Sequence, residues 1–138
     1  MRYLVDTNFL SELRRGSRAD RGVVRWLNTV PTDEWHVSVI TDYELEVGVL
    51  GLQRSDPKQG AELRRWLMGV RESYETRLLP ITPEIGRICA TIQVPDRRQL
   101  GDALIAATAI HHGLTVVTRN EKDFDVPGLS VINPFSVR

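Results

Sequence analysis

Short apolar runs along the chain alternate with longer stretches in which apolar residues recur at helical spacing. Five runs are predicted to be strands, because short apolar runs bounded by turn residues are typical of buried strands: residues 2–6, 35–40, 77–81, 114–118 and 129–132. Pro80 cannot donate to a ladder, so the third run is predicted to be an edge strand. Helices are predicted at residues 9–13, between Asp20 and Pro31, after Thr41, at 60–74, after Thr82-Pro83 and at 101–113. This alternation predicts an α/β fold, with a central parallel sheet of four to five strands flanked by helices.

The predicted helix at residues 101–113 is apolar on all sides, which is typical of a buried helix. Gly113 follows it, where a helix commonly ends in the left-handed conformation. Asp102 is the exception in this helix, because a carboxylate that faces a packed interior is unfavourable unless it is paired or bound to a metal. The alternative is that Asp102 lies in the first turn and only complements the helix dipole.

Further acidic residues follow the predicted strands. Asp6 ends the first strand, Glu44 lies one turn beyond the second, and the polar turn after the fourth contains Asp123. Ligand sites in parallel sheets lie outside the carboxyl ends of the strands, so we expect these residues to meet Asp102 at one rim. Local roles are the alternative: Asp6 can cap the next helix, and Thr41 and Glu44 have the spacing of a capping box.

Carboxylates held together repel one another, and their pKa values rise unless a cation compensates. Mg²⁺ and Mn²⁺ prefer sites built entirely from oxygen ligands. The pattern therefore favours Mg²⁺, with Mn²⁺ as the second choice. Zinc is not indicated, because His36 stands alone and the pair His111 and His112 is explained by a favourable position in the last turn of a helix.

Length and composition indicate one domain over residues 1–138. Lys plus Arg equals Asp plus Glu at 18 each, so net charge does not indicate a nucleic-acid partner. Only two of the 18 basic residues are lysines, and five arginines crowd one segment: Arg14, Arg15, Arg18, Arg21 and Arg25. Guanidinium groups suit phosphate, so this segment is either a phosphate-facing rim or a plain solvated face.

The single cysteine, Cys89, excludes an intrachain disulfide and fits a reducing compartment. No apolar run approaches the roughly 18 to 20 residues of a membrane span, and Asp6 interrupts the start too early for a secretory signal. We therefore expect a cytoplasmic protein without a membrane partner.

Several segments together resemble the PIN domains of the VapC-type toxin family, the ribonuclease half of bacterial toxin–antitoxin pairs. In order these segments are Leu4-Val5-Asp6-Thr7-Asn8, Thr41-Asp42-Tyr43-Glu44-Leu45, Asp102-Ala103-Leu104-Ile105-Ala106-Ala107-Thr108-Ala109, Val117-Thr118-Arg119-Asn120-Glu121-Lys122-Asp123-Phe124 and Ile132-Asn133-Pro134-Phe135. The resemblance spans essentially the whole chain. It implies a PIN-like fold, Mg²⁺ or Mn²⁺ at the rim of the sheet, a homodimer, and a cognate antitoxin that covers or invades the active site.

By this resemblance, Asp6 and Asp102 match the metal ligands of the family, and Glu44 matches its acid on the helix after the second strand. Many members have a fourth acid where this chain has Asn120, which leaves a second metal position open. Asp123, three residues further on, reaches the same site if the turn is helical. Thr7 and Asn8 are expected to orient Asp6.

These residues predict a toxin that hydrolyses RNA phosphodiester bonds with the help of a divalent metal. Arg14, Arg15 or Arg119 is expected to steer the RNA backbone, and Asn120 to bind a ligating water or the substrate. One alternative is a phosphotransfer enzyme with an aspartyl nucleophile, but position 8 is Asn where the haloacid-dehalogenase pattern has Asp. A receiver domain would need an extra acid pair before the first-strand acid and a lysine near the fourth or fifth strand, where this chain offers only Lys122. The other is a PIN-like scaffold that binds RNA or a protein without cutting.

Overall fold

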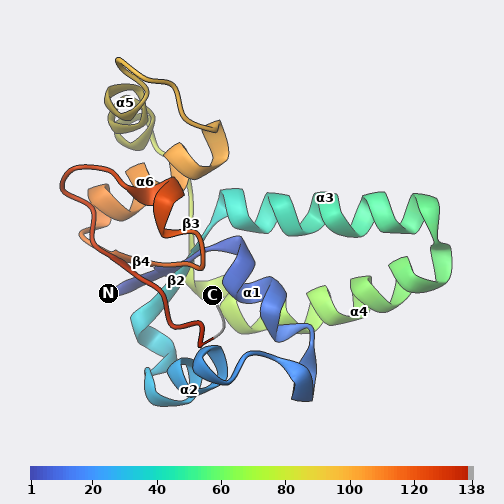
Figure 1. Ribbon diagram of the computed structural model, residues 1–138. Helices are drawn as coiled ribbons and strands as arrows, with labels where there is room; N and C mark the ends of the chain where they lie inside the picture. Colours follow the sequence, from blue (N-terminus) through green and yellow to red (C-terminus); the bar gives the residue numbers. More distant parts are fainter. Residues whose placement is uncertain (137–138) are drawn as a thin grey trace.

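A five-stranded parallel sheet forms the centre of the computed structural model, which describes residues 1–136 (Figure 1). The strands are β1 (Tyr3–Val5), β2 (Trp35–Ser38), β3 (Leu78–Leu79), β4 (Thr115–Val117) and β5 (Val131–Ile132). They lie in the order β3-β2-β1-β4-β5, and every neighbouring pair is parallel. The predicted fold class is confirmed, and β3 is the edge strand that Pro80 indicated.

Six α-helices connect and cover the strands. They are α1 (Thr7–Leu13), α2 (Arg21–Thr29), α3 (Val39–Ser55), α4 (Pro57–Tyr74), α5 (Pro83–Ile92) and α6 (Leu100–His112). Helix α2 begins where Asp20 predicts, because the Asp20 carboxylate accepts the N–H groups of Gly22 and Val23. Helix α6 ends at Gly113, whose φ of 69° is the left-handed conformation that glycine adopts without strain.

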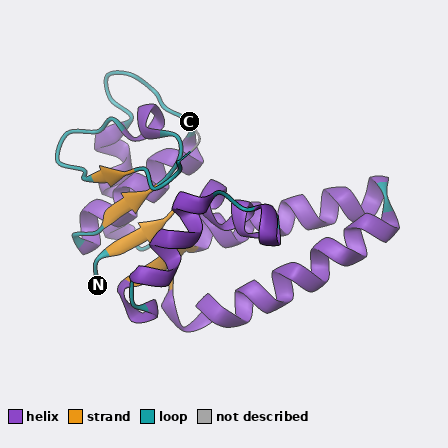
Figure 2. Cartoon of the chain, turned by 60° about the horizontal axis from the view of Figure 1, so that its bottom comes forward, coloured by secondary structure: helices purple, strands orange, loops and turns teal. Residues whose placement is uncertain are grey.

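The two faces of the sheet are covered by different helices (Figure 2). Val5, Val37 and Val117 pack with residues of α1, α2, α3 and α4 in one core. Leu4 and Val116 point to the opposite face and pack against α6. Helix α5 lies outside α6. The molecule is therefore a three-layer sandwich, in which successive residues of each strand serve opposite layers.

Helices α3 and α4 form an antiparallel hairpin that projects from the body as an arm (Figures 1 and 2). They have 17 and 18 residues, so each is about 26 Å long. Asp56 joins them and caps α4 by accepting the N–H of Gln59 at 3.2 Å. At Gly60 a Cβ atom would lie 2.4 Å from the Cα of Gln53, so only glycine allows the two helices to approach this closely.

The order of the strands reverses beside β1. The chain runs from β1 outward to β2 and β3 on one side, and α5 and α6 then carry it across to β4 on the other side. In open parallel sheets, the crevice at such a switch point is where ligands bind. Val5 is in register with Val117, so the next residues, Asp6 and Thr118, lie side by side at the carboxyl edge of the sheet.

Candidate metal centre

Asp6 lies at the switch point and is held rigidly. Its backbone N–H donates to the carbonyl of Val117 at 2.9 Å, and the side chain is only 5% exposed. One carboxylate oxygen accepts the N–H of Thr7 at 2.8 Å, and the other accepts the hydroxyl of Thr118 at 2.8 Å. Asp6 is also the N-cap residue of α1, so the local alternative and the proposed ligand role are compatible.

Asn8 links the ends of β1 and β4. Its amide nitrogen donates to Asp6 at 3.2 Å and to the hydroxyl of Thr118 at 3.1 Å. Its amide oxygen accepts the backbone N–H of Arg119 at 3.1 Å. Thr7 and Asn8 therefore both touch the acidic residues that they are expected to orient.

The environment of Glu44 corrects two predictions about the start of α3. Strand β2 ends at Ser38, two residues earlier than predicted, because the Ser38 hydroxyl caps the helix by accepting the N–H of Ile40 at 3.0 Å. Thr41, after which the helix was predicted to begin, therefore lies inside the first turn, and the capping box that was the alternative role of Glu44 is absent. Glu44 instead accepts the hydroxyl of Thr7 at 2.5 Å. The carboxylate is thus turned toward β1 rather than back to its own helix.

Asp102 lies half-buried in the first turn of α6. Within residues 1–136 no hydrogen bond to its carboxylate is found. Burial and, after it, the charges of Asp6, Asp123 and Glu44 together raise its pKa to about 6. Gly101 brings the start of α6 close to α3, since a Cβ atom there would lie 3.2 Å from a carboxylate oxygen of Glu44. Four carboxylates from four segments therefore interact at this edge.

The same causes act on Asp6. Burial raises its pKa, the hydrogen bonds from Thr118 and Thr7 lower it, and the charges of Glu44 and Asp123 raise it again; the pKa is raised overall. Asp123 belongs to the short 3₁₀ helix η4 (Glu121–Phe124), so the turn is helical, as its approach to the site requires.

The donor set suits a hard divalent cation, because it consists of carboxylate oxygens that repel one another. Among the residues that the structure describes, no three acidic, histidine or cysteine side chains lie close enough to enclose a metal ion. Coordination of a cation would therefore require side-chain rotations, and Asp102, whose carboxylate has no hydrogen bond within residues 1–136, is the residue best able to move.

The other predicted residues lie in two places. Asn120, Arg119 and Asp123 line a hollow of about 470 Å³ beyond β4, and the Arg119 guanidinium stacks 4.6 Å from the ring centre of Phe135. Arg14 and Arg15 lie at the far end of α1, where Arg15 pairs with Glu12 at 3.4 Å. The structure therefore does not bring these two arginines to the carboxylates.

Sequence reasoning missed two hydroxyl residues that support the site. Thr118 donates to Asp6 and accepts both the side-chain amide of Asn8 and the N–H of Asn120. The hydroxyls of Thr41 and Thr7 form a hydrogen bond at 3.1 Å. Thr118 carried a usable signal, because it is the polar residue that ends the predicted strand 114–118, as Asp6 ends the first. Thr41 carried none, since its contact depends on how α3 packs against α1.

Fold and site together define an α/β protein with an oxygen-rich acidic centre at the switch point of its sheet. The family model of the PIN domain matches residues 3–128. VapC ribonuclease Y4jK of Sinorhizobium fredii is 31% identical over 138 aligned residues, which cover 96% of each chain. Toxin FitB of Neisseria gonorrhoeae is 32% identical over 137, covering 96% of this chain and 97% of that protein.

Solved structures also match this chain. The FitAcB crystal structure from N. gonorrhoeae matches with a TM-score of 0.85 and 32% identity, over 96% of this chain and 97% of that one. VapBC2 from Rickettsia felis, bound to a DNA fragment from its promoter, matches with a TM-score of 0.77 and 21% identity, over 96% and 98%, which supports the fold. The chain belongs to the PIN-domain family and is a relative of the VapC and FitB proteins. Within residues 1–136, no helix is both long and apolar enough to cross a membrane.

Proposed function

We propose that the protein is the toxin of a toxin–antitoxin pair and, as a single domain, a metal-dependent endoribonuclease. Its relatives are named as a VapC ribonuclease and as a FitB toxin. The observation that carries the proposal is the state of Asp102. Its carboxylate is half-buried beside three other acids, its pKa is raised to about 6, and no hydrogen bond to it is found in the described part of the chain. A divalent cation is the partner that this arrangement calls for.

Asp6, Glu44 and Asp102 would hold Mg²⁺ or Mn²⁺ in this proposal. When bound, such an ion supplies Lewis-acid activation of a phosphodiester and of the attacking water. The protein fixes the ligands: Thr7 and Thr118 hold the Asp6 carboxylate, and Thr7 also holds Glu44. Asp123 is exposed, and its negative charge raises the pKa values of Asp6 and Asp102. In this proposal it would accept a proton from water or complete the ligand set.

Asn120 and Arg119 would act on the RNA. Asn120 has no charge with which to hold a second metal, so we assign it to a hydrogen bond with water or substrate. Arg119 lines the hollow, and its guanidinium, stacked on Phe135, would bind a phosphate of the RNA there. Arg14 and Arg15 would contact the backbone farther from the cut.

Cleavage of mixed structured RNAs by the purified protein tests the activity, with Mg²⁺, Mn²⁺ or EDTA. We expect cutting with either metal, none in EDTA, and none by Asp6→Ala. Asp96→Asn is the matched control, because Asp96 is an exposed acid outside the centre. Cutting that persists in EDTA would overturn the proposal.

A binding scaffold without nuclease activity is the second candidate. Two observations favour it: Asn120 replaces an acid, and no three possible ligands enclose a metal as the side chains lie in residues 1–136. RNA binding that survives EDTA and Asp6→Ala, without cleavage under any metal, would identify the scaffold.

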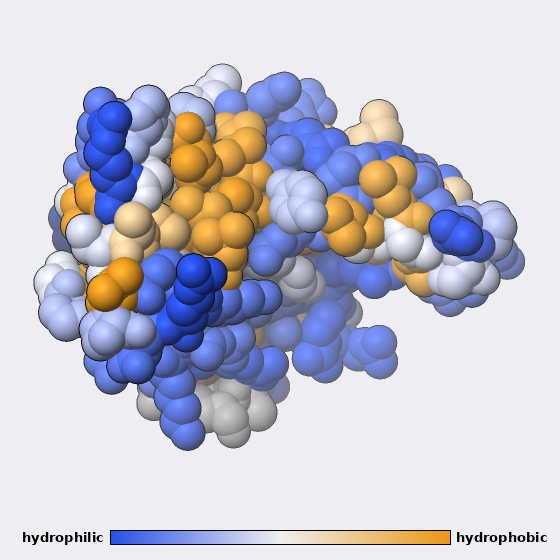
Figure 3. Space-filling view, turned by 90° about the horizontal axis from the view of Figure 1, so that it is seen from above, coloured by the Kyte–Doolittle hydropathy of each residue, from blue (hydrophilic) through white to orange (hydrophobic). Residues whose placement is uncertain are grey.

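The proposed partners are a cognate antitoxin and a second copy of the chain. The solved relatives include toxin–antitoxin complexes, among them VapBC and FitAB assemblies. Helix α3 exposes a stripe of Tyr43 (64% exposed), Val47 (50%) and Leu50 (53%) at helical spacing. Figure 3 shows hydrophobic side chains on this face, both along the arm and over the body.

We assign the stripe on α3 to the homodimer. Val47→Glu places a charge at the centre of the stripe and is expected to yield a monomer in analytical ultracentrifugation. Glu62→Lys is a control on the exposed surface of α4. A wild-type monomer, or a Val47→Glu dimer, would contradict this assignment.

A further inference from the structure

Five arginines on the segment from the end of α1 to the middle of α2 form a surface of their own. We call it the arginine surface; it consists of Arg14, Arg15, Arg18, Arg21 and Arg25. All five side chains are exposed. Residues 14–25 contain one acid, Asp20, so the segment has a formal net charge of +4 in a chain whose formal net charge is zero. This segment therefore carries an excess of positive charge that the rest of the chain balances.

Within residues 1–136, ion pairs with nearby acids involve one of the five guanidinium groups of the arginine surface. Asp20 points its carboxylate to the start of α2, where it accepts the N–H groups of Gly22, Val23 and Ser136. Glu12 is 7% exposed and accepts the N–H of Asp20 at 2.8 Å. Glu12 also pairs with Arg15, and that is the one ion pair of the arginine surface within residues 1–136.

A hollow of about 500 Å³ lies inside this surface, between the short 3₁₀ helix η1 (Gly16–Arg18) and α2. Arg21 and Arg25 line it, together with Val24, which is 37% exposed, and with Asn28 and Thr29. The side-chain amide of Asn28 is exposed, and no hydrogen bond to it is found within residues 1–136. The hollow thus combines two guanidinium groups, an apolar wall and an amide that both donates and accepts.

We propose that the arginine surface binds the phosphodiester backbone of RNA and that its hollow receives an unpaired nucleotide. This inference rests on the proposed ribonuclease function and assigns part of its substrate site. Guanidinium groups bind phosphate oxygens in bidentate fashion, and side chains read RNA mainly through unpaired nucleotides. An unpaired stretch of RNA offers both kinds of partner in every nucleotide, a phosphate for the arginines and a flat base for Val24.

The position of the surface agrees with that role. Helix α1 begins beside Asp6 and ends beside Arg14, and its seven residues span about 10 Å. In Figure 1 the end of α1, η1 and α2 follow one another along the lower side of the body. An RNA strand cut at the acidic centre therefore reaches the arginine surface a few nucleotides from the cut.

The test measures binding of the full chain in EDTA, so that cleavage and binding are separated. The probe is fluorescein-labelled oligouridylate of about 20 nucleotides, titrated by anisotropy at about 50 to 200 mM KCl. The variant is Arg18→Gln/Arg21→Gln/Arg25→Gln, and the matched control is Arg54→Gln/Arg65→Gln/Arg87→Gln. The control removes three exposed arginines elsewhere, so both proteins have the same net charge.

We expect the variant on the arginine surface to bind on the order of 10-fold more weakly than the wild type. The slope of log K against log salt should become less steep by about 2, since each lost phosphate contact removes roughly 0.7 from that slope. The control should keep the wild-type slope. Equal slopes for the two triple variants would overturn the proposal. Polyglutamate that competes as well as unlabelled oligouridylate would overturn the assignment to RNA.

Asn28→Ala tests the hollow separately. It should weaken binding of the oligouridylate severalfold and leave binding of an RNA duplex of equal length unchanged. Equal losses for both probes would overturn the assignment to an unpaired nucleotide. Because all binding is measured without metal, failure of the nuclease would appear only in the cleavage assay, and failure of this inference only here.

Discussion

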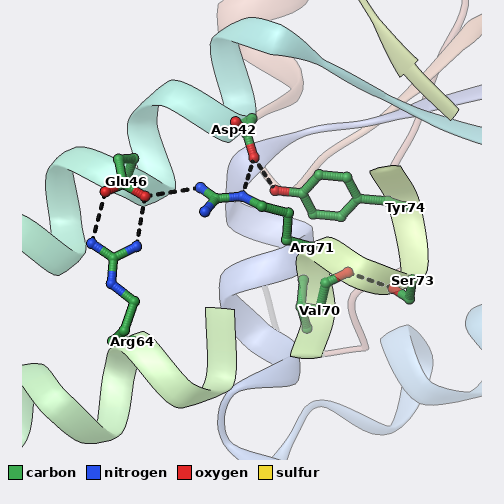
Figure 4. Close-up of polar contacts among 7 residues, drawn as sticks. All are labelled: Asp42, Glu46, Arg64, Val70, Arg71, Ser73 and Tyr74. Atoms are coloured by element: carbon green, nitrogen blue, oxygen red, sulfur yellow. Dashed lines mark hydrogen bonds and ion pairs between the residues drawn. The ribbon is translucent and has the colours of Figure 1, made fainter. Parts of the chain in front are cut away.

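Helix α3 presents acidic side chains to two regions of opposite character. On one side Glu44 faces the acidic centre, where Asp6 and Asp102 add further negative charge and no basic side chain shares a hydrogen bond with them in the described chain. On the other side Asp42 and Glu46 face α4, where each acid contacts at least one arginine (Figure 4). The same residue types, less than one turn apart, therefore meet different partners.

We call the second region the arm clamp; it consists of Asp42, Glu46, Arg64, Arg71 and Tyr74. Arg64 makes two bonds to Glu46, at 2.8 and 2.7 Å, in bidentate geometry. Arg71 bridges the two acids, at 2.8 Å to Asp42 and 3.0 Å to Glu46. The buried hydroxyl of Tyr74 donates to Asp42 at 2.5 Å, and burial and this bond raise its pKa. The arm clamp joins α3 to α4.

The two regions shift pKa values in opposite directions. Hydrogen bonds from Arg64 and Arg71 lower the pKa of Glu46 to about 2, whereas burial and neighbouring acids raise that of Asp102 to about 6. A carboxylate with matched donors stabilises the fold, and one without them is unfavourable until a cation arrives. These opposite pKa shifts distinguish the arm clamp, which is a structural cluster, from the acidic centre, which is the candidate functional cluster.

The largest expected effect is on the acidic centre. Asp102→Asn should lower RNA cleavage on the order of 100-fold or more, because loss of groups that merely orient metal ligands already lowers activity 10- to 100-fold. Initial rates with Mg²⁺ measure this, beside Asp96→Asn as control. Wild-type rates in a folded Asp102→Asn protein would remove Asp102 from the mechanism.

Breaking the arm clamp should affect stability instead. Arg71→Met removes the bridge between Asp42 and Glu46 and should lower the free energy of unfolding by about 2 kcal/mol, less than for a fully buried pair because the groups are about one quarter to one third exposed. Urea unfolding measures this, with Arg65→Met as the control on the exposed side of α4. A change below about 0.5 kcal/mol would show that the arm clamp adds little.

Asp102→Asn should stabilise the metal-free protein. The raised pKa means that the folded state prefers the neutral form of Asp102, so ionisation destabilises the fold as pH rises from about 4 through about 6. In EDTA near pH 7 we expect a gain on the order of 1 kcal/mol, since the group is half-exposed. The gain should vanish below about pH 4. Thermal unfolding across this range measures it.

Mg²⁺ should reduce the difference in stability between Asp102→Asn and the wild type, because an ion that binds only the folded wild type raises the Tm of the wild type. Asp102→Asn should respond less to the metal. A Tm that is equally insensitive to Mg²⁺ in both proteins would argue against a metal at this site.

Glu46→Gln should give the smallest effect, with the opposite sign. The lowered pKa means that ionised Glu46 stabilises the fold above its ordinary pKa near 4.5, and that this contribution is lost as pH falls toward about 2. We expect a loss below about 1 kcal/mol at neutral pH that fades in acid. Loss of stability that is independent of pH would show that packing, rather than charge, explains the change.

Sequence patterns predicted the strands and helices because each has its own period and its own end signals. Asp20 and Gly113 marked helix ends through interactions within their own segments, and Pro80 marked an edge strand by lacking a donor. The spacing of Thr41 and Glu44 indicated a local role that the structure does not show. This spacing fits a capping box, but Ser38 is the better placed cap, and packing against Thr7 draws Glu44 away.

The chain by itself thus determined the order of its elements, the parallel sheet and the acids at its carboxyl edge, since these follow from hydrophobic period and strand direction. Only the tertiary structure decided which acids gain partners. Asp42 and Glu46 are neutralised by arginines 18 to 29 residues away across the arm, a pairing set by how α4 lies on α3. Within residues 1–136, Asp102 has no arginine partner of this kind, because α6 and α4 pack on opposite faces of the sheet. Charge compensation depends on distances between segments, and those exist only once the layers have packed.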